Sequence, residues 1–493
     1  MTVTEVLDEA GVVSEIPAAV ASAEVESIAY DSRQVEKGSL FFAFVGARFD
    51  GRLFAPQALK KGAVAIVSEL PAPADLDGPW IQVRHGREAL ALAAGKLLGH
   101  PDRRLHVVGI TGTNGKTTTS HIIDSIFRRA GFITALIGTI EYRLAGRPLP
   151  AVNTTPESLD LLRIFLELER AGGTHVTMEA SSHALALGRV HGIRFETAVF
   201  TNLTRDHLDF HSSMDEYFAA KQKLLLPETT EAPRWAVLNY DDSYGRSLKS
   251  KPETEVLWYG LEEGATARAQ RIASSFEGLR FEIQFGGRAY LVESPLVGQI
   301  NVYNILAAWC TAISNGIGPD VIAQGIRECR AVPGRFERVQ AGQPFLVVVD
   351  YAHTDDALRN TLAIARTLTD KRVITLFGCG GDRDRAKRPL MAMAAAEGSD
   401  LVVLTSDNPR SEDPVAIMND ALVGLRRFDT PHLVEPDREK AIRRAIEAAG
   451  PGDVVILAGK GHETYQVLKD KTIPFDDREV ARRVLSGFGY GEK

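Results

Sequence analysis

One segment has the residue order of a phosphate-binding loop. The apolar run LHVVGI at 105–110 is followed by a glycine turn and then by the amphipathic stretch KTTTSHIIDSIF. At such a strand-to-helix turn, backbone amides face an anion, a lysine adds positive charge, and a threonine hydroxyl can ligate Mg²⁺. The residues predicted to hold a nucleotide phosphate are Gly112, Thr113, Asn114, Gly115, Lys116, Thr117 and Thr118. A plain glycine turn would explain Gly112 and Gly115 but not the Lys-Thr-Thr-Thr run.

Two further polar side chains follow strand-like runs. Glu179 follows the apolar run in THVTMEA at 174–180, and His207 comes after TAVFTNLT at 197–204. Because the carboxyl ends of parallel strands share one edge of a sheet, both side chains are expected near Lys116 as ligands of a magnesium ion. Taken singly, a strand-end Glu or His is more often a solvated or capping group, so the shared location carries this prediction.

Lys221 lies in YFAAKQKLLL at 217–226, which predicts a helix with an apolar stripe. On these residues alone, the favoured interpretation is a lysine whose stem covers apolar surface while its ammonium group stays in water.

These residues need a scaffold of more than one domain, since 493 residues exceed what a single core usually organises. Residues 1–100 contain short apolar runs at 40–46 and 63–68 and a helical stretch at 87–100, which predicts a small α/β domain. Residues 101–331 repeat the order strand, turn, helix, which predicts a central P-loop domain built on a parallel sheet. Within this domain, the alternating pattern between about 270 and 295 predicts antiparallel hairpins.

The last third of the chain, residues 332–493, predicts a doubly wound, Rossmann-like domain. The apolar runs LVVVD, VITLFG, LVVLTS and VVILAG each end in glycine or polar residues and alternate with helical segments. In open sheets of this kind, ligands bind beyond the carboxyl ends of the strands, which is where the polar clusters of this segment fall. The predicted fold class is therefore α/β with three domains.

Composition narrows the function class. The net charge of −7 disfavours binding to nucleic acid or to an anionic membrane surface. The three cysteines are widely spaced without CxxC motifs, which indicates neither a disulfide framework nor a structural zinc site. The chain has no apolar run long enough for a membrane span and begins with an acidic segment, so a cytoplasmic protein is expected.

Several segments together resemble the Mur ligase family. TGTNGKTTT at 111–119 is similar to the nucleotide loop of these enzymes. It is followed, in the family's order, by NTTPES, MEASSHALALGRV, FTNLTRDHLDFH, YFAAKQKLLL and, in the last third, TSDNPRSEDP and AGKGHET. The segment YDSRQVEKGSLFFAFVGARFDG at 30–51 resembles the family's uridine-muramoyl binding segment. The resemblance covers nearly the whole chain, although Arg52, Leu187 and Asp355 depart from residues common at their positions.

The resemblance implies a set of binding residues. For ATP it adds to the phosphate loop the residues Asn304, Arg335, Asp350 and His353. For a UDP-muramoyl dipeptide it implies Ser32, Asn153, Thr154, Thr155, Ser181 and Arg189. For meso-diaminopimelate it implies Arg383, Asp407, Asn408, Pro409, Arg410, Gly459 and Glu463. Lys221 would be carbamylated by CO₂ and, with Thr117, Glu179 and His207, would hold magnesium. Lys116, Glu179, His207 and Lys221 are then the expected catalytic residues.

The expected reaction is the ATP-dependent addition of meso-diaminopimelate to the D-glutamate side chain of the UDP-muramoyl dipeptide, through an acyl phosphate, by a monomeric enzyme of cell-wall precursor synthesis. TSDNPRSEDP resembles the diaminopimelate form of the family's amino-acid recognition loop, and an arginine fork suits the extra carboxylate that lysine lacks. An ordinary Asp-Asn-Pro turn is the structural alternative. Two other functions stay open: a sister ligase that adds lysine or another amino acid, or glutamate to folate, and a P-loop ATPase that acts as a mechanical or binding module.

Overall fold

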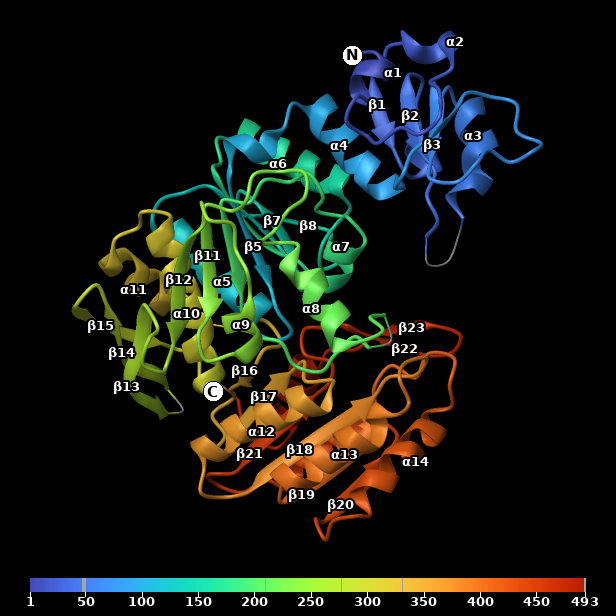
Figure 1. Ribbon diagram of the computed structural model, residues 1–493. Helices are drawn as coiled ribbons and strands as arrows, with labels where there is room; N and C mark the ends of the chain where they lie inside the picture. Colours follow the sequence, from blue (N-terminus) through green and yellow to red (C-terminus); the bar gives the residue numbers. More distant parts are fainter. Residues whose placement is uncertain (47–49, 209, 276, 330, 492–493) are drawn as a thin grey trace.

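The computed structural model describes residues 1–46, 50–208, 210–275, 277–329 and 331–491. Residues 47–49 of the segment predicted to bind uridine, and Asp209 of FTNLTRDHLDFH, lie outside the described residues. The chain forms three α/β units, each around its own main sheet, which follow one another along the sequence (Figure 1). The predicted fold class is confirmed.

The first unit is a four-stranded parallel sheet in the order β1-β2-β3-β4. Its strands are β1 Ser27–Ala29, β2 Ser39–Phe42, β3 Ala65–Ser68 and β4 Trp80–Gln82. Its helices are α1 Val3–Val6, α2 Ala18–Ala21, α3 Ala55–Lys60 and α4 Gly86–Leu98, with 3₁₀ turns at Ser32–Gln34, Gly51–Phe54 and Pro101–Arg104. Buried residues of α4, such as Leu90 and Ala94, belong to one apolar core with residues of both the first and the central sheets. Helix α4 therefore joins the two units.

The central unit is an eleven-stranded sheet in the order β15-β14-β13-β12-β11-β10-β5-β9-β6-β7-β8. Its strands are β5 His106–Thr111, β6 Thr134–Ile137, β7 Tyr142–Leu144, β8 Arg147–Leu149, β9 His175–Glu179, β10 Thr197–Phe200, β11 Trp235–Asn239, β12 Glu255–Gly260, β13 Ala267–Ser275, β14 Gly278–Phe285 and β15 Arg288–Ser294. Its helices are α5 Lys116–Arg129, α6 Ser158–Arg170, α7 Ser182–Ala186, α8 Met214–Gln222, α9 Ser243–Ser247, α10 Gln299–Ser314 and α11 Pro319–Glu328. The strands from β12 to β6 run parallel, and β13, β14 and β15 form the predicted antiparallel hairpins.

Apolar cores cover both faces of this sheet, because successive side chains of a strand point to opposite faces. On β5, Val107 packs into the core shared with α4 and α6, whereas Val108 and Ile110 pack with α5, α10 and α11. With both faces covered, the edge at the carboxyl ends of the strands is the place where polar side chains meet solvent.

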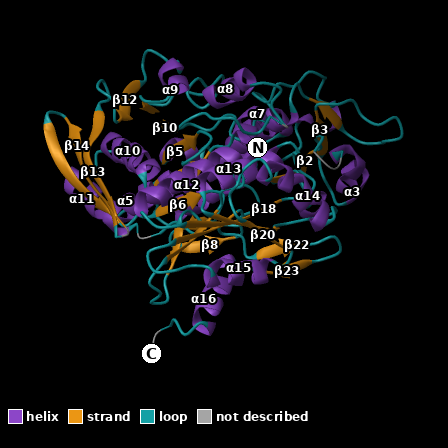
Figure 2. Cartoon of the chain, turned by 90° about the horizontal axis from the view of Figure 1, so that it is seen from below, coloured by secondary structure: helices purple, strands orange, loops and turns teal. Residues whose placement is uncertain are grey.

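The third unit is a six-stranded sheet in the order β16-β17-β21-β18-β19-β20, parallel except for the edge strand β16. Its strands are β16 Glu337–Val339, β17 Leu346–Asp350, β18 Val373–Cys379, β19 Leu401–Ser406, β20 His432–Glu435 and β21 Val454–Ala458, followed by the hairpin β22 Tyr465–Val467 and β23 Thr472–Pro474. Its helices are α12 Asp355–Leu368, α13 Lys387–Gly398, α14 Pro414–Leu425, α15 Arg438–Glu447 and α16 Asp477–Gly487. Helices α13 and α14 lie on one side of β18 and β20, and α15 and α16 lie on the other (Figure 2), which is the predicted doubly wound arrangement.

We propose units of residues 1–100, 101–331 and 332–493, each of which contains one of the three main sheets. None of the described helices is both long and apolar enough to cross a membrane. Asp355, which departs from the resembled pattern, is the first residue of α12 and follows the N-cap Thr354. An acidic side chain at a helix start is stabilised by the helix dipole, so this departure leaves the helix start intact.

His175 at the start of β9 makes the stability of the central unit depend on pH. Its ring stacks on Phe132 with a centroid distance of 3.9 Å, and burial lowers its pKa to about 4 from an ordinary value of 6.5. As the pH falls through this interval the unfolded chain binds the proton first, so His175 destabilises the fold below pH 6.5. Between pH 6.5 and about 4, the free energy of unfolding of the wild-type protein should decline as the pH falls. We expect His175→Phe, which keeps an aromatic ring, to make this decline shallower by about 1 kcal/mol per pH unit. Urea unfolding across this interval measures the slope, and equal slopes for the two proteins would contradict the prediction.

Candidate functional site

The phosphate loop joins β5 to α5, and two positions in it require glycine. Gly112 and Gly115 have φ angles of +142° and +89°. A Cβ atom on Gly112 would collide with Oγ1 of Thr201, and one on Gly115 would collide with Oδ1 of Asn304. Left-handed φ and close neighbours together exclude larger residues there. Helix α5 starts at Lys116, so its free N-terminal amides face the loop.

The residues after β10 hold this loop in place. Thr113 N donates to Asn202 O at 2.8 Å, Asn114 N donates to Asn202 Oδ1 at 3.0 Å, and Thr201 Oγ1 donates to Asn114 O at 2.6 Å. The predicted strand TAVFTNLT therefore ends at Phe200, because Thr201 and the residues after it leave the sheet to bond with the phosphate loop.

Two lysines converge on a single carbonyl oxygen of the loop. Nζ of Lys116 lies 2.9 Å and Nζ of Lys221 lies 2.8 Å from Gly112 O, and both donate to it. Lys221 is only 1% exposed, and its ammonium group lies 4.4 Å from the ring centre of Tyr217. The interpretation of Lys221 as a lysine reaching into water is therefore wrong. Burial, and then the nearby positive charge of Lys116, lower the pKa of Lys221 well below its ordinary value, which favours the neutral amine.

Glu179 ends β9 beside this lysine pair. Its carboxylate is 1% exposed and accepts hydrogen bonds from Thr139 N at 2.8 Å and from Thr139 Oγ1 at 3.1 Å. Burial lowers the pKa of Lys116, and the charge of Glu179 opposes that effect, so the two side chains interact electrostatically. The structure thus brings Glu179 to the phosphate loop.

His207 has a left-handed backbone with φ of 53°, and its Nε2 lies 3.5 Å from Oδ2 of Asp206. Desolvation lowers its pKa to about 4, opposed by Asp206 and reinforced by Lys116 and Lys221. The imidazole is therefore neutral near pH 7, the form that binds metals. The charge of Asp206 also acts on Lys116 and Lys221. Asp206 was not among the predicted site residues, although it lies in the segment FTNLTRDHLDFH.

Few side chains near the phosphate loop could ligate a metal ion. Within the ranges that the structure describes, no three His, Cys, Asp or Glu side chains gather as a metal site. The predicted donors Glu179 and Thr117 fit magnesium in type, since carboxylate and hydroxyl oxygens suit this ion, and His207 adds a neutral ring nitrogen. One more anionic oxygen would complete such a set.

Arg335 of the third unit reaches the phosphate loop. Its Nη2 donates to Thr117 Oγ1 at 3.3 Å, and its guanidinium lies 4.8 Å from the ring centre of Tyr351. On the central unit, Asn304 Oδ1 accepts from Thr119 Oγ1 at 3.3 Å. Both predicted ATP residues therefore border the first turn of α5.

Asp350 and His353, the other predicted ATP residues, are held by the third unit. Asp350 accepts from Phe336 N at 2.7 Å, Ala352 N at 2.9 Å and Thr361 Oγ1 at 3.0 Å, and burial raises its pKa. Nδ1 of His353 lies 3.0 Å from Tyr351 O, and burial lowers its pKa. Asp350 therefore fixes the backbone that carries Arg335 rather than bonding the phosphate loop itself.

A second contact between the units was not foreseen. Oδ2 of Asp356, in the first turn of α12, accepts from Asn114 Nδ2 at 3.1 Å and from Thr204 Oγ1 at 3.0 Å. The central and third units thus meet directly over the phosphate loop.

Most of the residues predicted to bind the dipeptide lie close to Glu179. Thr139 Oγ1, which bonds Glu179, also lies 3.1 Å from Oγ1 of Thr154. Thr155 Oγ1 donates to Glu179 O at 2.8 Å and accepts from Ser181 N at 3.1 Å. Asn153 N donates to the hydroxyl of Tyr142 at 3.2 Å in the same loop.

Arg189 joins the same group through Thr155 and Glu157. Its Nη1 donates to Thr155 O at 3.2 Å, and its Nε lies 3.0 Å from Oε1 of Glu157. The same carboxylate lies 3.2 Å from Nε of Arg87 on α4, so two arginines share it. Ser32 lies apart, in the first unit, where its hydroxyl donates to Gln57 Oε1 at 3.1 Å. Neither Glu157, although it lies in the segment NTTPES, nor Arg87 was among the predicted site residues.

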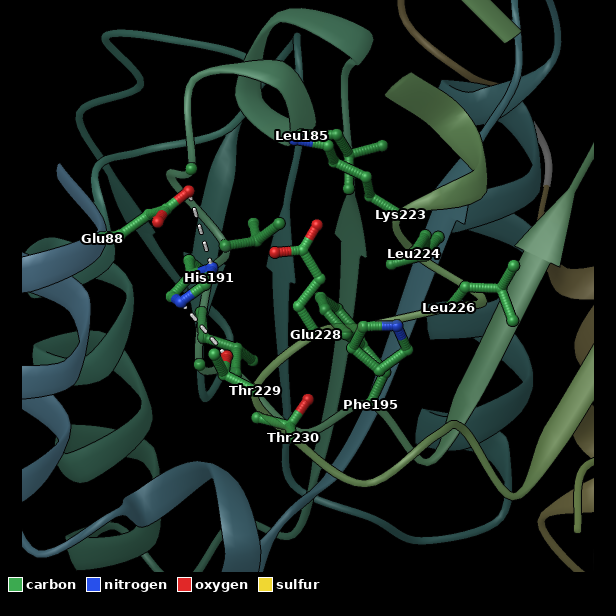
Figure 3. Close-up of a pocket in the computed structure, with 15 residues that line it drawn as sticks. Glu88, Leu185, His191, Phe195, Lys223, Leu224, Leu226, Glu228, Thr229 and Thr230 are labelled. Carbon is green, nitrogen blue, oxygen red and sulfur yellow. Dashed lines mark hydrogen bonds and ion pairs between the residues drawn. The ribbon is translucent and has the colours of Figure 1, made fainter. Parts of the chain in front are cut away.

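A pocket beside Arg189 contains none of the predicted residues. Its apolar walls are Leu185, Phe195, Leu224 and Leu226 (Figure 3). On its rim, His191 lies 4.0 Å from Glu88 and 3.2 Å from Thr229 Oγ1.

The predicted amino-acid residues of the third unit gather at the carboxyl ends of β18, β19 and β21. Asn408 Nδ2 donates to Glu463 Oε2 at 2.9 Å, and Gly459, with φ of +112°, lies against Asp407. A Cβ atom on Gly380 would lie 2.9 Å from Nη1 of Arg410 and 3.9 Å from Cγ of Arg383, so the two arginines flank one turn. Pro409, between Asn408 and Arg410, lies against Gly381 of this turn, and its carbonyl accepts from Glu412 N at 3.0 Å.

Tyr351 connects this cluster with the phosphate loop. Its ring packs on Arg335, and its ring centre lies 5.1 Å from that of His462, next to Glu463. The phosphate loop therefore has contacts on two sides. On one side are the residues predicted to bind the dipeptide, and on the other is the cluster predicted to bind the amino acid.

Comparisons with known proteins agree with this geometry. Three family models match: the Mur ligase middle domain over residues 110–312, the Mur ligase glutamate ligase domain over residues 334–461, and the Mur ligase family catalytic domain over residues 24–96. The chain is 66% identical, over 99% of both chains, to the UDP-N-acetylmuramoyl-L-alanyl-D-glutamate–2,6-diaminopimelate ligase of Solibacter usitatus. It is 47% identical to the ligase of the same name from Geobacillus thermodenitrificans, over 94% of this chain and 95% of that protein.

Solved structures show the same fold. A structure of a UDP-N-acetylmuramoyl-L-alanyl-D-glutamate–2,6-diaminopimelate ligase superimposes with a TM-score of 0.71 at 32% identity and covers 99% of both chains. The MurF ligase from Thermotoga maritima in complex with ADP has a TM-score of 0.64 at 19% identity, over 88% of this chain and 94% of that chain.

Proposed function

This chain belongs to the Mur ligase family, and on that basis we propose that it joins meso-diaminopimelate to the D-glutamate side-chain carboxylate of UDP-N-acetylmuramoyl-L-alanyl-D-glutamate at the expense of ATP. The product is the tripeptide precursor of peptidoglycan. The observation that carries the proposal is that three predicted ligand sites adjoin in one structure. Thr139 connects the dipeptide residues with Glu179 beside the phosphate loop, and Tyr351 connects Arg335 with the amino-acid cluster.

The chemistry begins with a carboxylate, which is a poor electrophile until it is phosphorylated. The γ-phosphoryl group of ATP passes to the D-glutamate carboxylate and forms an acyl phosphate, and ADP leaves. The amine of diaminopimelate then attacks the acyl carbon, and the tetrahedral intermediate expels phosphate. Lys116, Arg335 and the N-terminus of α5 offer positive charge and N–H donors to the transferring group, which is the main protein contribution in phosphoryl transfer.

Magnesium fits the donors at the loop. When bound, it would neutralise phosphate charge and hold the oxygens in position. Thr117, Glu179 and His207 would ligate it, and Lys221 as a carbamate would add the missing anionic oxygen. Support for the carbamate comes from the burial and lowered pKa of Lys221, since only the neutral amine reacts with CO₂.

We also propose that the units close over bound ligands, since an acyl phosphate must be kept from water. The contacts of Arg335 with Thr117 and of Asp356 with Asn114 support closure at the phosphate loop. We propose that the enzyme is a monomer of the reducing cytoplasm, and the three free, buried cysteines suit that compartment.

The decisive experiment supplies the purified protein with the UDP-muramoyl dipeptide, ATP, magnesium and either meso-diaminopimelate or L-lysine, and measures the mass of the nucleotide product. We expect the diaminopimelate tripeptide, with one ADP formed per tripeptide. Preference for lysine would identify a sister ligase instead. ATP consumption at the same rate without either co-substrate would identify a simple P-loop ATPase.

A further inference from the structure

Lys460 is a fully buried lysine inside the predicted amino-acid site, and neither its motif nor the mechanism above gives it a role. Its side chain is 0% exposed. Its Nζ lies 3.1 Å from Glu463 Oε2, 3.3 Å from Asn408 Oδ1 and 3.6 Å from Asp407 Oδ1. These three neighbours are residues predicted to recognise diaminopimelate.

The backbone on both sides of Lys460 requires glycine. Gly459 and Gly461 on either side of it have φ angles of +112° and +53°, and a Cβ atom on Gly459 would lie 3.0 Å from Asp407 Oδ2. Hydrogen bonds from Arg438 also hold the ends of the two strands that lead to the site, β19 and β21. Arg438, itself buried, donates to Ser406 O at 3.3 Å and to Ala458 O at 3.0 Å, which are the last residues of β19 and β21. The position of Lys460 relative to Asp407 is thus determined by the frame of the sheet.

The contacts around Lys460 leave one hydrogen-bond acceptor of its neighbours unused. A buried ammonium group needs anionic or polar partners, and here two carboxylates and an amide oxygen surround it. Among the described residues no donor forms a hydrogen bond with Asp407 Oδ1, although this oxygen is buried. One lysine therefore balances one of two carboxylates, and an acceptor remains for a second cation.

We propose that Lys460 sets the charge of the amino-acid site and so makes it selective for a ligand end that carries both an ammonium and a carboxylate group. With Lys460 present, Asp407 and Glu463 have charge left for one ligand ammonium group, while Arg383 and Arg410 take the carboxylate. Without Lys460, the site gains negative charge, which repels a ligand carboxylate and favours an amine alone. The inference rests on the proposed function and assigns Lys460 as a positioning and specificity residue.

The test is Lys460→Met, which keeps the length of the side chain and removes its charge. We expect the KM for meso-diaminopimelate to rise about tenfold, and the preference for meso-diaminopimelate over L-lysine in kcat/KM to fall about tenfold or more. The KM values for ATP and for the UDP-muramoyl dipeptide are expected to stay within about twofold, since a residue that only supports the fold would change all three. Lys440→Met is the matched control, because Lys440 is 69% exposed on α15 of the same unit.

A second variant separates charge from folding. In Lys460→Met/Asp407→Asn the cluster regains its original net charge, so part of the preference for diaminopimelate over lysine is expected to return relative to the single variant. If Lys460→Met unfolds, the double variant is compared with wild type, and a fall in the preference for diaminopimelate over lysine as large as that expected for the single variant would overturn the inference. A folded Lys460→Met protein with wild-type selectivity would also overturn it. A wild-type protein that forms no diaminopimelate tripeptide would instead refute the proposed function.

Discussion

Lys221→Ala is expected to lower the rate of tripeptide formation by about a thousandfold. The wild-type side chain lies buried with Nζ 2.8 Å from Gly112 O, next to the ammonium group of Lys116. This location lowers its pKa, and the neutral amine can then take up CO₂ to become an anion beside the phosphate loop. Alanine can supply neither the anion nor the hydrogen bond. Added bicarbonate should therefore raise the activity of a CO₂-depleted wild-type enzyme and leave the variant unchanged.

The measurement combines steady-state kinetics with a direct test for the carbamate. Carbon-13 NMR of the wild-type protein in labelled bicarbonate should show one carbamate signal that is missing from Lys221→Ala. Lys223→Ala is the matched control, because Lys223 is exposed two positions further along the chain. Affinity for ADP should change much less than the rate, since Lys116 and the loop remain. Near-normal turnover of Lys221→Ala would refute the role of Lys221.

The local order of the chain was enough to predict the phosphate loop. Strand, glycine turn, lysine and helix are adjacent in the sequence, and the structure places them as β5, Gly112–Gly115 and α5. The parallel sheet also explains why Glu179, at the end of the neighbouring strand β9, reaches the same edge. Alternation of apolar residues likewise predicted the hairpins of β13, β14 and β15.

Contacts between distant segments could not be predicted in this way. Lys221 bonds a carbonyl 109 residues away, and without that contact the apolar stripe of α8 suggested an exposed lysine. Asp356 and Glu157 meet their partners on distant segments, Asn114 and Thr204 for Asp356 and Arg87 and Arg189 for Glu157, so the order of the chain alone does not mark them. The short edge strand β20 was missed because His432–Glu435 is largely exposed and lacks an apolar run. The resemblance to a family supplied the residues of the amino-acid site, but the packing around Lys460 came only from the structure.

Arg410 should control the affinity for the amino acid with little effect on the nucleotides. Its backbone is left-handed with φ of 52° and is held by the bond from Arg410 N to Val467 O at 3.1 Å. Its Nη1 donates to Gly381 O at 2.7 Å, so the side chain is fixed while other N–H groups of the guanidinium stay available. A guanidinium binds a carboxylate through two parallel hydrogen bonds, which the point charge of lysine does not reproduce.

We therefore expect Arg410→Lys to raise the KM for meso-diaminopimelate about a hundredfold and to leave the KM values for ATP and the UDP-muramoyl dipeptide within about twofold. Arg385→Lys is the matched control, since Arg385 is 68% exposed in the neighbouring loop and pairs with Asp420. Steady-state kinetics with each substrate varied in turn measure the three constants. The rise should be confined to the diaminopimelate constant, because the side chain of Arg410 contacts the turn at Gly380 and Gly381, whereas Arg335 and Asp356 contact the phosphate loop. An equal rise in all three constants would mean that Arg410 supports the third unit as a whole rather than the ligand carboxylate.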